Sequence, residues 1–143
     1  MYELLQKLHS WWAYLTLVVL FIAVLNALLG YTSKKVFSSK DLRISLFALI
    51  FTHVQLLLGV AVYFVSQKGI KAFGTEGAMK IAELRLTMLE HPLINLIAIA
   101  LITIGWSKHK KAAPELKFRK ILFFYGIGLL LILSRLPWSS WLA

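Results

Sequence analysis

Histidine is the residue type in this chain that is best suited to catalysis or metal binding. Four histidines occur and there is no cysteine, which excludes disulfides, thiolate metal sites and iron–sulfur clusters. Any metal chemistry must therefore use histidine, carboxylate or a cofactor. A haem iron takes two axial ligands that face each other across the porphyrin, so two histidines would have to lie at one depth in the fold. The four are His9, His53, His91 and His109.

Long apolar runs must position these histidines. The 143 residues are 59% hydrophobic and their mean hydropathy is +0.76, which is too apolar for a soluble domain. A helix that crosses a bilayer needs about 20 apolar residues, because every backbone polar group must be satisfied internally there. The sequence therefore predicts an all-α, polytopic membrane protein. We expect a single domain over residues 1–143, a bundle of four transmembrane helices at 11–31, 44–65, 92–106 and 121–138.

The distribution of charge predicts the orientation of the bundle. The formal net charge is +10, and the basic residues gather in the short loops 32–43 and 107–120. The positive-inside rule places both loops inside and both termini outside, whereas a nucleic-acid partner would need a continuous basic stripe. The lipid bilayer is therefore the expected partner. Four tryptophans stand at the outer level: Trp11, Trp12, Trp138 and Trp141.

The outer connection between the second and third runs predicts a further helix. It breaks at Gly69 and Gly74 and then shows helical apolar spacing from Thr75. Because proline lacks a backbone N–H, this short outer surface helix, residues 75–90, should end or kink where the chain reaches Pro92.

Depth selects one pair of histidines. His9 precedes the first apolar run by two residues and His91 immediately precedes the third, and these two runs cross the membrane in the same direction. The match survives a reversed topology, because both histidines then move together to the other face. His53 lies about nine residues into its run, so no second pair exists at one depth. The pattern predicts one haem b per chain, its iron held by His9 and His91.

Several residues are placed to serve such a haem. The cations Arg135 and Arg85 lie at the outer level and would face the propionates, and Arg135 lies within the last turn of the fourth run, where a charge usually has a partner. Asn95, one turn beyond His91, would orient a ligand or bond to a neighbouring helix. Gln55 and Gly59 share a face with small residues, which we expect to point inward.

The remaining histidines have less defined roles. With Gln55 and Gly59 inward, His53 lies beside another helix or at a subunit contact, and a quinone-binding or proton-relay role stays open. His109 stands among lysines and is expected in a solvated loop. A simpler interpretation of the whole set also stays open, in which His9 and His91 are interfacial residues that begin helices and Arg135 reaches lipid phosphate.

Three stretches carry a family resemblance: His9-Ser10-Trp11-Trp12, His53-Val54-Gln55-Leu56-Leu57-Leu58-Gly59 and Glu90-His91-Pro92. Through them the chain resembles small bacterial cytochrome-b-like membrane proteins, and more distantly one four-helix half of haem A synthase. The resemblance covers most of the chain and implies a multi-pass protein of the bacterial inner membrane with haem on His9 and His91. The synthase pattern has glutamate three residues before its first histidine, where this chain has Gln6, which argues against haem hydroxylation.

Three functions follow as hypotheses. The first is electron transfer by the haem, with a quinone or a respiratory-chain protein as partner. The second is a haem-modifying enzyme related to haem A synthase, and the third is a cofactor-free accessory or scaffold subunit. An electron carrier fits the residues better than a catalyst. The sequence leaves open a homo-oligomer or a subunit of a larger complex.

Overall fold

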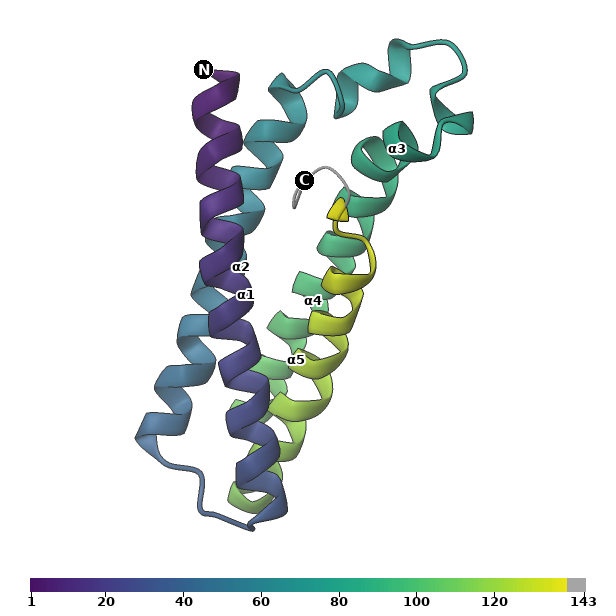
Figure 1. Cartoon of the computed structure of the whole chain (residues 1–143). Coiled ribbons are helices and arrows are strands. Elements are labelled where there is room, and N and C mark those ends of the chain that lie inside the picture. The colour runs from purple at the N-terminus through teal and green to yellow at the C-terminus, as the bar shows by residue number, and fades with distance from the viewer. Residues whose placement is uncertain (139–143) are drawn as a thin grey trace.

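The computed structural model describes residues 1–138, whose regular elements are all helices, with no strand among them (Figure 1). Trp141 lies outside the described residues. Three helices are long: α1 (Tyr2–Thr32), α2 (Ser39–Val65) and α4 (His91–Lys111). Two are shorter, α3 (Ala82–Arg85) and α5 (Lys117–Ser134). The all-helical class predicted from the sequence is therefore confirmed for this part of the chain.

Four helices, α1, α2, α4 and α5, form two hairpins that lie side by side (Figure 1). α1 pairs with α2 and α4 with α5, while α1 also packs against α5 and α2 against α4. Both hairpin connections lie at one end of the bundle, here called the short-loop end. The N-terminus, the end of α5 and the start of α4 lie at the opposite end, here called the histidine end.

Most of the buried core lies in the half of the bundle nearer the short-loop end; Ile132 and Leu136 extend it toward the histidine end, where Met88 belongs to a second small cluster. Near the short-loop end, small side chains allow the helices to approach closely, and a methyl group added at Gly30 would overlap the Phe118 ring. Tyr125 is fully buried and donates a hydrogen bond from Oη to the carbonyl of Ser45 across 2.9 Å. The core side chains of the four helices include Leu20, Ala23, Ala27, Ala48, Ala98, Ile102, Phe118, Ile121, Tyr125 and Leu129.

A buried carboxylate fixes the α1–α2 hairpin at the short-loop end. Asp41 has no exposed surface and caps α2 through the backbone N–H and hydroxyl of Ser38, both at 2.9 Å. Asn26 donates to it from α1 at 3.0 Å, and Lys35 lies 3.2 Å away. The carboxylate therefore joins a helix start, the loop and the neighbouring helix.

Three segments within residues 1–138 are long and apolar enough to cross a membrane: Tyr2–Thr32, Ser39–Gly74 and Ala82–Lys111. The chain is thus helical with the composition of a membrane protein. α5 is not among them, because three of its 18 residues are charged: Lys117, Arg119 and Lys120. It also ends at Ser134, so the helix predicted over 121–138 stops short and leaves Arg135 outside it.

The connection between α2 and α4 differs from the predicted surface helix over residues 75–90. It contains two 3₁₀ turns, Ile70–Gly74 and Ala78–Lys80, and a regular helix begins only at Ala82. Gly77 adopts a left-handed conformation with φ of 74°, which interrupts the helix that the apolar spacing favoured.

Pro92 neither ends nor visibly breaks the helix that contains it. α3 continues through a π-helical turn, Leu86–Glu90, into α4 without a non-helical residue between them. Proline has no N–H for the carbonyl four residues earlier, that of Met88. The Tyr63 hydroxyl donates to this carbonyl at 2.8 Å, so α2 supplies the hydrogen bond that Pro92 cannot.

Candidate functional site: a histidine pair

His9 and His91 come together at the histidine end. Their ring centroids are 6.3 Å apart and the ring planes are nearly perpendicular, at 80°. One ring comes from the second turn of α1 and the other from the first residue of α4, and both are half-buried. The structure thus places side by side the two histidines that share a depth in the sequence, although they are 82 positions apart.

The His91 ring is oriented by its Nδ1 atom. That nitrogen lies 3.0 Å from the backbone carbonyl oxygen of Arg135. A carbonyl only accepts, so Nδ1 carries the proton in this contact and the neutral ring presents a lone pair on Nε2. Asn95 lies against the same ring, with Nδ2 3.1 Å from Nδ1, and it also donates to the carbonyl of His91. This arrangement orients a histidine for ligation through Nε2.

The His9 ring is held from α2. Gln55 Nε2 lies 3.0 Å from His9 Nδ1 and donates to the His9 carbonyl at 3.0 Å. Gln55 Oε1 is buried and has no hydrogen-bond partner among the described residues. Gly59 lies under the ring, and a Cβ atom there would stand 3.2 Å from His9 Cε1. The face of α2 that carries Gln55 and Gly59 therefore points inward and contacts His9.

Two arginines are held near the histidine pair by ion pairs with one glutamate, Glu90. Arg85 Nε is 2.9 Å from Glu90 Oε2, and Arg135 Nε is 3.7 Å from Glu90 Oε1. Sequence reasoning singled out both arginines and missed Glu90, although it immediately precedes His91. The sequence signal that could have identified it is a carboxylate directly beside a predicted haem ligand. The Arg135 carbonyl contact was also missed, because it depends on where α5 ends.

His53 lies apart from the pair. Its Nδ1 donates to the carbonyl of Leu49 at 2.8 Å, and its Nε2 lies 3.3 Å from the Thr103 hydroxyl of α4. Thr103 is twelve residues beyond His91, about 18 Å along the helix axis. His53 therefore contacts a neighbouring helix nearer the middle of the bundle.

His109 corrects an expectation. The sequence placed it in a solvated loop, but it lies in the last turn of α4 with 1% of its surface exposed. Its Nδ1 is 2.6 Å from the Trp106 carbonyl, and its ring packs against Phe37 and Trp106. Its Nε2 has no partner among the described residues. The α1–α2 connection folds Phe37 over it, which local charge did not reveal.

The histidine pair suits a cofactor better than a bare ion. No group of three or more histidine, aspartate or glutamate side chains within residues 1–138 could hold a metal ion. A free ion at the pair would have two protein ligands, fewer than the usual four. A haem iron brings four porphyrin nitrogens and needs two axial ligands from the protein.

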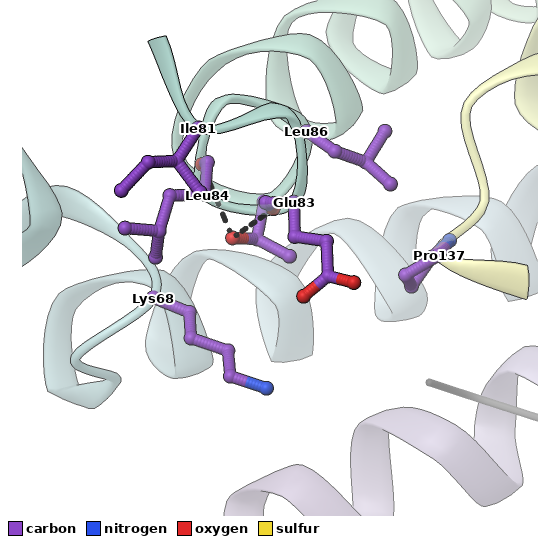
Figure 2. A pocket seen from close by; sticks show the side chains of 7 residues that line it. Lys68, Ile81, Glu83, Leu84, Leu86 and Pro137 are labelled. Atoms are coloured by element: carbon purple, nitrogen blue, oxygen red, sulfur yellow. Dashed lines mark hydrogen bonds between the residues drawn. The ribbon is translucent and has the colours of Figure 1, made fainter. Parts of the chain in front are cut away.

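Two surface clefts lie away from the pair. One, of about 100 Å³, lies at the histidine end, with Lys68 and Glu83 reaching toward it from different segments (Figure 2). It is lined by Lys68, Ile81, Glu83, Leu84, Leu86, Thr87 and Pro137. The other, of about 260 Å³, lies at the short-loop end and is lined by Lys108, Arg119, Lys120, Phe123 and Phe124. No protein-family model, curated protein or solved structure matches this chain.

Proposed function

We propose that this chain is a membrane-embedded haem b protein that transfers electrons, with His9 and His91 as the axial ligands of one haem. The observation that carries the proposal is the approach of these two rings, 6.3 Å apart, from helices that are not hairpin partners. The proposal joins this contact to the resemblance to cytochrome-b-like membrane proteins.

The distance between the rings supports axial ligation. Bonds between a metal and imidazole nitrogen are about 2 Å long, so two rings on opposite sides of an iron have centroids roughly 6 Å apart. The separation of 6.3 Å agrees with that value. His91 also donates from Nδ1 to the Arg135 carbonyl, which leaves its Nε2 without a protein partner among the described residues.

The packing of the histidine end supports a cofactor between the hairpins. The buried residues of α1 begin at Thr16, those of α2 end at Thr52, and those of α4 begin at Ala98. Between these positions and the histidine end, none of the three helices has a buried side chain. A porphyrin is large, flat and apolar, and would cover these surfaces.

The chain's own residues would bind and insulate the haem. When bound, the haem supplies a one-electron couple whose potential depends on its axial ligands, their hydrogen bonds and burial. The Arg135 carbonyl orients His91, the Gln55 amide orients His9, and Gly59 leaves space for the His9 ring. Arg85 and Arg135 provide positive charge for the propionates. Glu90 holds both guanidinium groups near His91.

The proposal includes a four-span topology in a bacterial inner membrane. α5 packs along α4 and shares the core with α1, so it belongs in the bilayer with them. The basic short-loop end then faces the cytoplasm, and both termini and the histidine pair face the other side. The electron partner is a membrane quinone or a respiratory-chain protein.

An absorption spectrum tests the proposal. Protein purified after expression with haem should show a Soret band and, when reduced, sharp low-spin α and β bands. His9→Ala and His91→Ala should each lose these bands, whereas His53→Ala, which removes a histidine outside the pair, should keep them. A colourless wild-type protein that stays colourless with added haem would support the scaffold hypothesis instead. Mass spectrometry of the extracted porphyrin separates a carrier, which leaves haem b unmodified, from a haem-modifying enzyme.

A further inference from the structure

The cleft at the short-loop end, here called the basic cleft, combines cations with an aromatic floor. It is lined by Lys108, Arg119, Lys120, Phe123 and Phe124. Lys108 comes from the last turn of α4, whereas Arg119 and Lys120 come from the first turn of α5. Its polar groups thus converge from two helices.

The three cations of the basic cleft have no partner within the described part of the protein, whereas several other basic residues at this end do. Lys35 pairs with Asp41, Lys117 donates to the His109 carbonyl at 2.8 Å, and Lys110 lies over the Trp106 ring. Within residues 1–138, Lys108, Arg119 and Lys120 make no hydrogen bond or ion pair, and no carboxylate lines the cleft. Their charge is left for a ligand outside the protein.

The aromatic residues continue the basic cleft toward the middle of the bundle. Phe123 and Phe124 lie about one helical turn beyond the cations, roughly 5 Å deeper along α5. Phe124 packs on Gly105 of α4, where an added methyl group would overlap it. Phe123 is 57% exposed and faces outward. Positive charge at the level of the head groups, with an apolar surface below it, matches the two parts of a lipid.

We propose that the basic cleft is a binding site for an anionic phospholipid. Lys108, Arg119 and Lys120 hold the phosphodiester, and an acyl chain lies along Phe123. Basic pockets between transmembrane helices on the cytoplasmic side recognise anionic head groups in this way. The inference depends on the membrane location of α4 and α5 and is independent of haem.

Native mass spectrometry of the detergent-solubilised full chain tests the site. Wild-type protein should retain added phosphatidylglycerol in preference to phosphatidylcholine. The variant Lys108→Gln/Arg119→Gln/Lys120→Gln should lose this preference by roughly tenfold or more. The matched control Lys40→Gln/Arg43→Gln/Lys111→Gln removes the same charges from the same end but outside the basic cleft, and should stay within about twofold of wild type.

The alternatives give different results. Equal losses in both triple variants would mean a diffuse surface charge and would overturn the site, as would wild-type protein without a preference. Displacement of the lipid by millimolar inorganic phosphate would indicate a simple anion site and overturn the lipid assignment.

A second measurement on wild-type protein does not depend on the folding of a variant. In phosphatidylglycerol nanodiscs, Lys108 and Lys120 should be acetylated several-fold more slowly than in phosphatidylcholine nanodiscs. Lys40 and Lys111 serve as internal controls in the same peptide map. Uniform protection of all four lysines would contradict a localised site.

Discussion

The two ends of the bundle differ in how they are held together. At the short-loop end, small side chains let the helices touch, and the buried Asp41 ties α2 to the loop and to α1. At the histidine end, α1, α2 and α4 meet through polar contacts around two half-buried rings, with no buried side chain of their own. The first end is complete as a protein core. At the second, the buried side chains include those of Ile132, Leu136 and Met88, and this is the end where we propose that a haem binds.

Haem should therefore stabilise one end and leave the other unchanged. A ligand present at about a thousand times its Kd stabilises the folded state by about 4 kcal/mol. Hydrogen exchange of the apoprotein and the haem-loaded protein should show slower exchange near His9, Gln55 and His91 on loading. Exchange around Asp41 and Tyr125 should stay the same. His9→Ala should remove the difference, and uniform protection along all helices would contradict the contrast between the ends.

The short-loop end should instead be sensitive to Asp41. Asp41→Ala removes a helix cap and charge-assisted hydrogen bonds, so we expect a loss of about 2 to 3 kcal/mol in the free energy of unfolding, with or without haem. Denaturant titration followed by circular dichroism measures it. Glu90→Gln removes a carboxylate from partly exposed ion pairs at the other end, and should cost less than about 1 kcal/mol. If Glu90→Gln were the more damaging change, the two ends would have been assigned the wrong roles.

The contacts at the two ends of the bundle also differ in how far the sequence predicts them. The meeting of His9 and His91 was predictable, because helix direction and the start of each apolar run fix depth. The inward face with Gln55 and Gly59 followed from helical periodicity. The burial of His109 was not predictable, because it depends on Phe37 from a distant loop.

Other misses arose from local backbone geometry. The left-handed Gly77 overrode a regular apolar spacing in the predicted surface helix. The position of Glu90 between two arginines depends on the π-helical turn before it. Periodicity reports which face of a helix is apolar, and it does not report where the helix changes pitch or ends.

A small effect is also expected at the turn that carries His91. Tyr63→Phe removes the hydroxyl that satisfies the Met88 carbonyl, which Pro92 leaves without an N–H donor. We expect a loss of about 1 kcal/mol in the free energy of unfolding, because one backbone acceptor is left unpaired. Tyr31→Phe, at an exposed tyrosine of α1, is the matched control and should be neutral. In haem-loaded protein, Tyr63→Phe should also broaden the low-spin α band, since His91 follows this turn directly. An unchanged stability would mean that water satisfies the Met88 carbonyl equally well, and that α2 does not hold the His91 turn in place.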